Sequence, residues 1–359
     1  MEQPVEKEKR VRIGITHGDM NGVSYEIIIK TLQDQRLMEL YTIVVYGSSK
    51  VASYHRKVLN INDFNFNLIK KADQAHPRRP NIINVHDEEI KIDLGKSTAI
   101  AGELSLLSLE AACEDLQKNN IDVIVTAPIN KKNIQSPGFD FAGHTEYFAK
   151  KFHAEDYLML MINNTLRIGV VTGHIPLSKV KETLTTELIL KKIQVMNHSL
   201  MRDFGIVKPR IAILALNPHA GDDGLIGNEE KTVILPAIEK AYSQNILAFG
   251  PYPADGFFGA TSFNNFDGIL AMYHDQGMVP FKLMSFDEGV NFTAGLSVIR
   301  TSPAHGTAYD LAGKNEASPE AFRNAMYMAG DIFMHRLEYD ELHANQLRPA
   351  AAQPENNRS

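Results

Sequence analysis

The stretch Ile168-Gly-Val-Val-Thr-Gly-His174 is a short apolar run, rich in β-branched residues, that ends in a histidine. Two further stretches have the same form: Ile211-Ala-Ile-Leu-Ala-Leu-Asn-Pro-His219 and Ile269-Leu-Ala-Met-Tyr-His274. Continuous apolar runs of this length are typical of strands that are buried on both faces. The three stretches therefore predict buried strands that each deliver a histidine at the carboxyl end.

Similar runs recur along the chain and alternate with longer segments of helical spacing. The predicted strands are 11–15, 42–46, 123–126, 167–171, 210–216, 268–272 and 296–299, and the clearest predicted helices are 103–118, 185–204, 229–242 and 319–337. This alternation predicts an α/β fold with a largely parallel sheet. No linker rich in Gly, Ser or Pro divides the chain, which favours two lobes that share a sheet or exchange strands, with a cleft between them.

The composition is that of an ordinary globular protein of 359 residues, with 44% hydrophobic content and a net charge of −6. The charges are scattered and form no basic block, so we expect no nucleic-acid partner. The N-terminus lacks an apolar core, and no apolar run approaches the roughly 20 residues of a membrane span, which predicts a cytoplasmic protein without a membrane partner. The single cysteine, Cys113, lies in an apolar helical pattern and is expected to be a buried helix residue.

The three strand-end histidines predict a metal site. Ligands of open α/β sheets bind outside the carboxyl ends of the strands, which places His174, His219 and His274 toward one edge. Neutral imidazoles suit a first-row divalent metal, and three protein ligands with open positions are the catalytic pattern. A single histidine at a strand end is more often a hydrogen-bonded loop residue, and no His-Glu-x-x-His spacing is present.

Polar segments around these strands are candidates for binding an anion. Gly143-His144-Thr145-Glu146 precedes a helical stretch, so Thr145 is a plausible N-cap, either as a cap alone or at a helix start that binds an anion. Lys282, Asn291 and Arg300 follow His274, and Arg and Lys side chains bind phosphate or carboxylate. Neither G-x-G-x-x-G after a strand nor G-x-x-x-x-G-K-[ST] occurs, which disfavours a classical Rossmann enzyme and a P-loop enzyme.

Over nearly its whole length the chain resembles the 4-hydroxythreonine-4-phosphate dehydrogenase family of pyridoxal-phosphate biosynthesis. The matching stretches are Gly14-Ile-Thr-His-Gly-Asp19, Thr126-Ala-Pro-Ile-Asn-Lys131, Gly143-His-Thr-Glu146, Leu216-Asn-Pro-His-Ala-Gly221, Gly250-Pro-Tyr-Pro-Ala-Asp255, Ala271-Met-Tyr-His-Asp-Gln-Gly277, Arg300-Thr-Ser and His305-Gly-Thr-Ala. The resemblance implies a homodimer with the active site at its interface. It also implies one divalent metal ion, Zn, Mg, Co or Mn, bound by His174, His219 and His274.

The family's substrate-binding positions fall on His144, Thr145, Lys282, Asn291 and Arg300. The segment from His305 to Gly313 also resembles the adenosine-binding loop of the isocitrate and isopropylmalate dehydrogenases. That likeness implies cofactor contacts at His305, Gly306, Thr307 and Asp310, and an acidic Asp310 favours NAD over NADP. Two lobes of the same type are expected at 10–129 plus 304–343 and at 130–303, with a disordered tail at 344–359.

The chain departs from the family pattern at three places. Met20-Asn-Gly-Val-Ser-Tyr25 stands where the family usually has Pro-Ala-Gly-Ile-Gly-Pro, Gly256 replaces a usual Thr, and Ala304 replaces a frequent Asp. The implied metal and phosphate positions are intact, so these changes bear on substrate detail and cofactor contacts more than on the reaction class.

The resemblance implies a decarboxylating, metal- and NAD-dependent dehydrogenase of 4-phosphooxy-L-threonine. Asp255, Asp275 and Lys282 are candidate bases, among which the sequence does not choose. A related dehydrogenase of 4-phosphorylated threonate or erythronate is an alternative. A metal-dependent lyase or phosphohydrolase is another, and a binding protein without activity is a weaker one because it would not need an open metal site.

Overall fold

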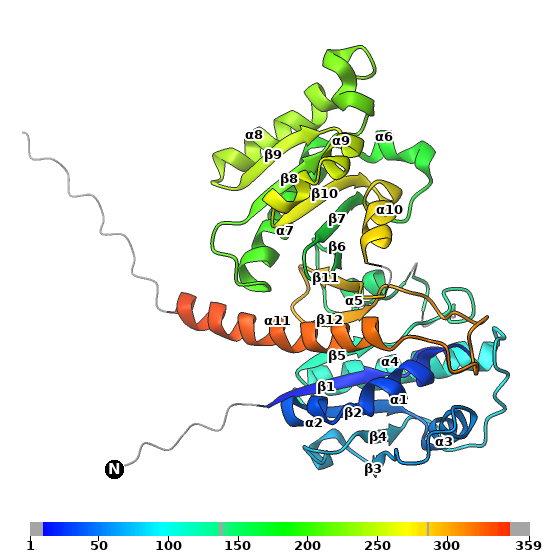
Figure 1. Cartoon of the computed structure of the whole chain (residues 1–359). Helices are drawn as coiled ribbons and strands as arrows, with labels where there is room; N and C mark the ends of the chain where they lie inside the picture. Colours follow the sequence, from blue (N-terminus) through cyan, green and yellow to red (C-terminus); the bar gives the residue numbers. More distant parts are fainter. Residues whose placement is uncertain (1–9, 136–138, 142, 286, 345–359) are drawn as a thin grey trace, which may run out of the picture.

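The computed structural model describes residues 10–135, 139–141, 143–285 and 287–344, and these form an α/β fold built on one mixed sheet (Figure 1). The strands of the described part follow the order β3-β4-β2-β1-β5-β12-β11-β6-β7-β10-β8-β9. They span β1 Val11–Thr16, β2 Tyr41–Gly47, β3 Asn67–Ile69, β4 Asn81–Asn84, β5 Val123–Thr126, β6 Leu158–Ile162, β7 Arg167–Thr172, β8 Arg210–Leu214, β9 Leu247–Tyr252, β10 Gly268–Tyr273, β11 Val290–Ala294 and β12 Arg300–Pro303.

Helices occupy most of the connections between these strands. They span α1 Ser24–Leu32, α2 Gln35–Leu40, α3 Ser49–Val58, α4 Ala99–Gln117, α5 His144–Lys151, α6 Val180–Thr183, α7 Thr186–Arg202, α8 Leu235–Ser243, α9 Ala254–Gly259, α10 His274–Met284 and α11 Glu320–Ala344. Thr98 and Thr185 cap α4 and α7 by accepting a hydrogen bond from a backbone N–H three residues on. None of the helices in the described ranges is long and apolar enough to cross a membrane.

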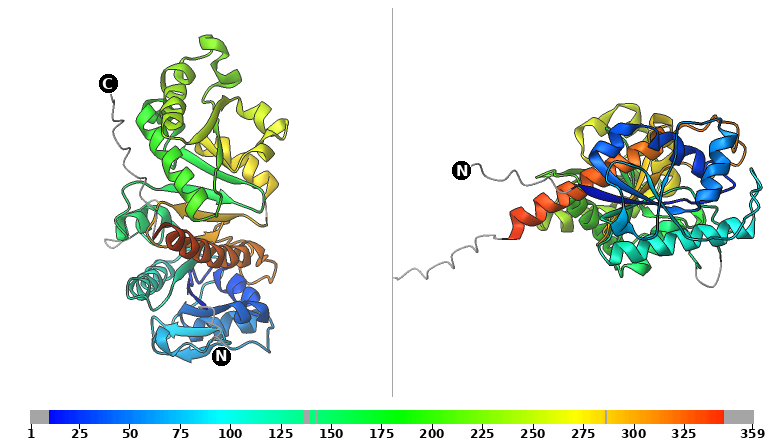
Figure 2. Two further views of the ribbon diagram at one scale, coloured as in Figure 1. Left: turned by 90° about the vertical axis from the view of Figure 1, so that its left-hand side faces the viewer. Right: turned by 90° about the horizontal axis from the view of Figure 1, so that it is seen from below.

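The predicted α/β fold with a largely parallel sheet is confirmed, and the departures from parallel pairing lie in the middle of the sheet. β11 pairs antiparallel with both β12 and β6, and β6 pairs antiparallel with β7. On either side of this block, the strands pair in parallel. Figure 1 shows β1–β5 below α11 and β6–β10 above it, and the views of Figure 2 confirm an elongated molecule. The two halves therefore share one sheet, whereas the expected lobe boundaries stay a prediction.

The predicted strand at 296–299 is wrong. Gly295 has a φ of +87°, so the chain turns directly after β11, and regular pairing resumes only at Arg300 in β12. Leu296 and Ile299 are nevertheless buried, because the connection itself packs into the core. Burial without strand pairing thus explains why an apolar run suggested a strand here.

The predicted helix at 229–242 is divided. A π-helical segment from Glu230 to Ile234 precedes α8. Pro236 lacks the backbone N–H that the ordinary helical ladder needs, which accounts for an irregular first turn. Cys113 is buried in α4 as expected, and burial raises the pKa of its thiol to about 12. The predicted tail at 344–359 lies outside the described residues apart from Ala344, which ends α11.

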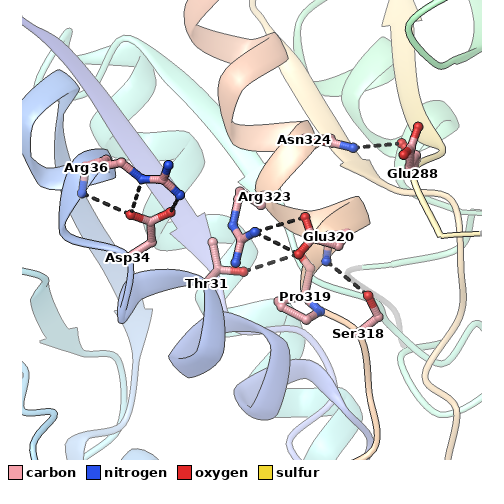
Figure 3. Close-up of polar contacts among 9 residues, drawn as sticks. All are labelled: Thr31, Asp34, Arg36, Glu288, Ser318, Pro319, Glu320, Arg323 and Asn324. Carbon is pink, nitrogen blue, oxygen red and sulfur yellow. Dashed lines mark hydrogen bonds and ion pairs between the residues drawn. The ribbon is translucent and has the colours of Figure 1, made fainter.

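The last helix, α11, lies across the join between the two halves. Figure 3 shows its first turn, where Asn324 donates to the carbonyl of Glu288 and Thr31 of α1 donates to the carbonyl of Pro319. Farther along, Arg336 Nε donates to Asp203 Oδ1 at 2.6 Å, and both side chains are buried. Since Asp203 follows α7, this ion pair ties α11 to the half that contains β6–β10.

Replacing Asp203 with Ala should destabilise the protein by about 3–5 kcal/mol, because it leaves the Arg336 guanidinium buried without its counter-charge. Urea unfolding followed by circular dichroism measures the loss. Glu187→Ala, which removes an exposed ion pair with Lys240, is the matched control and should leave the midpoint unchanged. Equal effects of the two substitutions would contradict the role of the buried pair.

Candidate active site

A cavity of about 290 Å³ opens where the antiparallel block meets the two parallel arms of the sheet. Its walls come from the segment after β5, the start of α5, strands β6, β11 and β12, and helix α10. Nine of the predicted site residues line it: His144, Thr145, His174, His274, Lys282, Asn291, Arg300, His305 and Gly306. The five predicted substrate-binding residues and two of the three predicted metal ligands are therefore brought to one place.

Arg300 provides a buried positive charge in the wall of this cavity. Its side chain donates to Thr126 Oγ1 from Nε at 3.0 Å and from Nη2 at 2.7 Å. The other described contacts are to His144 and Asn291, and no ion pair of the described residues includes Arg300. Burial lowers the pKa of this guanidinium to about 9. A buried cation whose hydrogen-bond partners are neutral and which forms no ion pair can bind an anion.

His144 presents a second donor beside Arg300. Its Nδ1 accepts from Arg300 Nη2 at 2.9 Å, which places the proton of the neutral ring on Nε2. Nε2 is buried and has no hydrogen-bond partner among the described residues. Burial, with the charges of Arg300 and Lys131, holds the pKa of His144 well below its ordinary value, so the ring stays neutral. The Nε2–H of His144 is therefore available to donate to an oxygen of an anion in the cavity.

The prediction that Thr145 is the N-cap of its helix is wrong. The helix α5 begins one residue earlier, at His144, and the extended residue Gly143 is the N-cap. Thr145 is therefore inside the first turn, where its side chain is buried and its Oγ1 lies 3.4 Å from Thr293 Oγ1 of β11. The hydroxyl thus packs α5 against the sheet, and Thr145 still lines the cavity.

His174 and His274 lie side by side in the wall of the same cavity. They follow β7 and β10, which are neighbours in the sheet, and their ring centroids are 5.5 Å apart. His274 Nδ1 is 2.7 Å from Asp275 Oδ1, and His174 Nδ1 is 3.6 Å from Glu146 Oε1. A carboxylate at Nδ1 leaves the lone pair of Nε2 for a metal, which is the usual outer support of a metal-bound histidine. These two rings fit two positions of a divalent metal site.

His219 does not join this pair within one chain. It lines neither the cavity nor a second hollow of about 420 Å³ that His174 and His274 also border. Among the described residues, no group of three His, Cys, Asp or Glu side chains is arranged to hold a metal ion. Of the three predicted metal ligands, His174 and His274 therefore lie together in one chain. The third, His219, lies on a loop after β8.

The loop that carries His219 has an unusual backbone. Residues 219–223 have φ values between +43° and +79°, a left-handed conformation that is costly for every residue but glycine. The buried carboxylate of Glu230 holds the start of this loop, because its Oε1 accepts from the N–H groups of Leu216 and Asn217. Such strain is maintained where a loop conformation serves a function, and here it sets the position of His219.

Only some of the predicted cofactor-binding residues and candidate bases line the cavity. His305 and Gly306 line the cavity, whereas Thr307 and Asp310 do not. Among the candidate bases, Lys282 lines the cavity and Asp275 borders only the second hollow. Asp255 is exposed on α9 and borders neither space.

Sequence reasoning missed three polar residues of this site. Thr126 holds Arg300, while Lys131 and Glu146 line the cavity. The side chain of His174 lowers the pKa of Glu146, whose Oε2 is buried without a hydrogen-bond partner in the described part of the chain. All three lie within the quoted stretches Thr126–Lys131 and Gly143–Glu146. The signal was therefore present, but the side chains were not singled out.

A mixed sheet with an anion-binding cavity beside an imidazole pair defines an α/β enzyme for a small anionic substrate. The family model described as pyridoxal phosphate biosynthetic protein PdxA matches residues 39–329. A 4-hydroxythreonine-4-phosphate dehydrogenase of Bacteroides thetaiotaomicron is 49% identical over 343 residues, covering 95% of this chain and 94% of the relative. The chain therefore belongs to the PdxA family of pyridoxal phosphate biosynthesis, and its activity is that of a dehydrogenase.

Two further comparisons support this assignment and add a neighbouring activity. The crystal structure of a 4-hydroxythreonine-4-phosphate dehydrogenase from Klebsiella pneumoniae superposes with a TM-score of 0.78 at 34% identity, covering 90% of this chain and 98% of that one. A D-threonate 4-phosphate dehydrogenase of Salmonella typhimurium is 36% identical over 321 residues, covering 88% of this chain and 97% of the relative. The family thus includes dehydrogenases named for different four-carbon phosphates.

Inorganic phosphate should raise the melting temperature of the protein by about 2 °C at a concentration tenfold above its dissociation constant, because it binds only the folded state. The physical reason is that phosphate supplies the anion that Arg300 and His144 lack. Differential scanning fluorimetry with phosphate and with chloride at equal ionic strength measures the shift. The same phosphate-dependent shift in an Arg300→Ala variant would show that the anion binds elsewhere.

Proposed function

We propose that the protein oxidises 4-phosphooxy-L-threonine with NAD to 2-amino-3-oxo-4-phosphooxybutanoate, which is decarboxylated to 3-amino-2-oxopropyl phosphate for pyridoxal 5'-phosphate biosynthesis. The observation that carries this proposal is one cavity lined both by a buried cation without an ion-pair partner and by a histidine pair. A short substrate with a phosphate on one end and a hydroxy acid on the other offers a partner to each of these two groups. The names of the relatives support the same substrate.

The phosphate end of the substrate would bind to Arg300 and His144, with Lys131 adding positive charge at the cavity wall. Binding at this end contributes no chemistry to the reacting carbon. It orients the alcohol toward the histidine pair and lowers the entropic cost of reaction. Asn291 on β11 lies beside Arg300, and its amide supplies a further polar contact within the same cavity.

In the same cavity, His174 and His274 would hold a divalent metal, with His219 as the predicted third ligand. When bound, the metal acidifies the substrate alcohol as a Lewis acid, and NAD accepts the hydride. Of the candidate bases, Lys282 is the one that lines the cavity, whereas Asp275 already faces His274 and Asp255 borders neither space. We therefore assign the acceptance of the alcohol proton to Lys282.

A D-threonate 4-phosphate is the second candidate substrate, and the relative from Salmonella typhimurium favours it at 36% identity. The two substrates share the phosphate and differ at C2, where one has an amine and the other a hydroxyl group. A metal-dependent lyase or phosphohydrolase would use the same histidines without NAD, but the relatives named here are dehydrogenases.

The purified enzyme should reduce NAD in the presence of 4-phosphooxy-L-threonine, and a chelator should abolish this reduction until a divalent metal is restored. Absorbance of the reduced nicotinamide measures turnover for this substrate, for D-threonate 4-phosphate and for erythronate 4-phosphate. A kcat/KM higher for D-threonate 4-phosphate would reassign the substrate. Product formation from any of the three without NAD reduction would overturn the dehydrogenase proposal.

We further propose that the working enzyme is a homodimer in which His219 of the partner subunit completes the metal site. Two observations support this arrangement: His219 lies away from the pair within one chain, and apolar side chains are exposed next to the pair. Leu177, Val279 and Leu283 are 72%, 56% and 81% exposed, on the segment after His174 and on α10. Exposed apolar side chains in one region are typical of a protein interface.

A mixture of His219→Ala and His274→Ala variants tests this arrangement, because each alone should be inactive while keeping the fold. If His219 acts across the interface, a mixed dimer contains one intact site and one doubly altered site. Unfolding and refolding the mixture should then restore about a quarter of the wild-type activity. A mixture as inactive as its components, with light scattering confirming dimers, would contradict the shared site.

A further inference from the structure

The buried carboxylate of Asp19 is hydrogen-bonded to Tyr309, in the segment that follows His305. Asp19, fully buried in the turn after β1, accepts a hydrogen bond from Tyr309 OH at 2.7 Å and another from Asn133 Nδ2 at 2.8 Å, both on Oδ2. The Tyr309 hydroxyl in turn accepts from Asn130 Nδ2 at 3.0 Å. Burial and the contact with Asp19 raise the pKa of Tyr309 to about 12, so the phenol stays protonated and donates. The hydroxyl is therefore satisfied as both donor and acceptor.

The turn that carries Asp19 is itself fixed by hydrogen bonds. Its Oδ1 accepts from the N–H of Asn21 at 2.9 Å. The Asn21 side chain is buried, donates to the Lys96 carbonyl and to Thr98 Oγ1, and accepts from the N–H of Asp93. Asn21 belongs to the run 20–25, in which the chain departs from the family's usual sequence. The departure thus supplies a polar anchor that joins residues 93–98 to the turn.

The segment after His305 lies directly against both of these pieces. The N–H of Val23 donates to the carbonyl of Thr307 at 3.0 Å, and a Cβ on Gly22 would lie only 2.4 Å from that oxygen. Gly95, which has a φ of +75°, lies against the carbonyl of Tyr309. A Cβ at this position would lie only 3.0 Å from that oxygen, which is a tight contact. Backbone contacts and the Tyr309 hydroxyl therefore fix one face of this segment.

The start of the segment reaches the active-site cavity. His305 and Gly306 line that cavity, and His305 Nε2 is buried with no hydrogen-bond partner among the described residues. Only three residues separate His305 from Tyr309, so a change in the anchoring of the phenol is transmitted along a short, turned backbone. The site-facing end of the segment thus depends on a hydrogen bond made outside the cavity.

We propose that Asp19 and Tyr309 are positioning residues that hold the segment 305–313 in the conformation that binds the nicotinamide dinucleotide cofactor. This inference rests on the proposed function, which uses NAD, and on the resemblance of residues 305–313 to an adenosine-binding loop. The hydrogen bond from Tyr309 OH to Asp19, called the bridge below, raises the fraction of molecules in the binding-competent conformation. It touches no reacting atom. It therefore bears on the affinity for the cofactor and leaves the affinity for the phosphorylated substrate, which binds at Arg300, unchanged.

Tyr309→Phe removes the hydroxyl and keeps the ring, so the test perturbs the bridge without opening a cavity. We expect the KM for NAD to rise about tenfold, because a hydrogen bond to a buried carboxylate is lost. The kcat and the KM for 4-phosphooxy-L-threonine should stay within twofold. Tyr242→Phe, which alters a 70%-exposed tyrosine on α8, is the matched control and should change none of these values.

Hydrogen exchange supplies a second measurement that needs neither cofactor nor substrate. In Tyr309→Phe, the amides of 305–313 should exchange about tenfold faster than in the wild type, while those of the central strands exchange as before. An Asp19→Ala variant should show the same change, and the double variant should be no worse than either single one if the two side chains act as a unit. Thermal unfolding confirms that each variant is folded.

The outcomes separate the inference from the proposed function. Unchanged exchange and an unchanged KM for NAD in Tyr309→Phe would overturn the positioning role, even with a fully active enzyme. A wild-type enzyme that does not reduce NAD with any of the three phosphorylated acids would instead overturn the proposed function. Faster exchange without a change in the KM for NAD would show that the bridge orders the segment but that the segment does not bind the cofactor, which also refutes the inference.

Discussion

The burial of the Arg300 guanidinium without a carboxylate partner is the constraint on which the site depends. Desolvation of this cation is costly, and the neutral contacts from Thr126 and His144 offset only part of that cost. Its strand, β12, pairs with β5 of one half and with β11 of the other. The charge is therefore fixed at the join of the two halves, where a bound phosphate would stabilise both the cation and the junction.

The same junction explains why the cavity combines groups from distant parts of the chain. The antiparallel strands β6 and β11 separate two parallel arms, so α5 and β12 provide the cationic end while β7 and β10 provide the histidines. Two segments have backbone conformations that the chain does not favour locally. One is the left-handed loop after β8 that carries His219, and the other is the segment 305–313, in which Ala308 has a φ of +42° and Tyr309 donates to Asp19.

Most of the fold and much of the site could be predicted from local pattern. The strand at 123–126 is reproduced by β5, and the runs before His174 and His274 form β7 and β10 with their histidines at the carboxyl ends. Local pattern failed at 296–299, because an apolar run reports burial whether or not the backbone pairs. It failed again at Thr145, because the helix begins at His144, directly after the extended backbone of Gly143. The residue at which a helix begins depends on the backbone conformation before it, which the pattern of side chains does not specify.

The sequence by itself determined the fold class, the family and the residue types of the site, because each is encoded in short runs whose chemistry does not depend on their surroundings. Only the tertiary structure decided which of those residues meet. It brings His174 and His274 together, keeps His219 apart within one chain, and leaves Asp255 outside the cavity. It also shows that Asp19 and Tyr309, 290 positions apart, share a hydrogen bond. Such contacts follow from strand order and loop path, which no local spacing specifies.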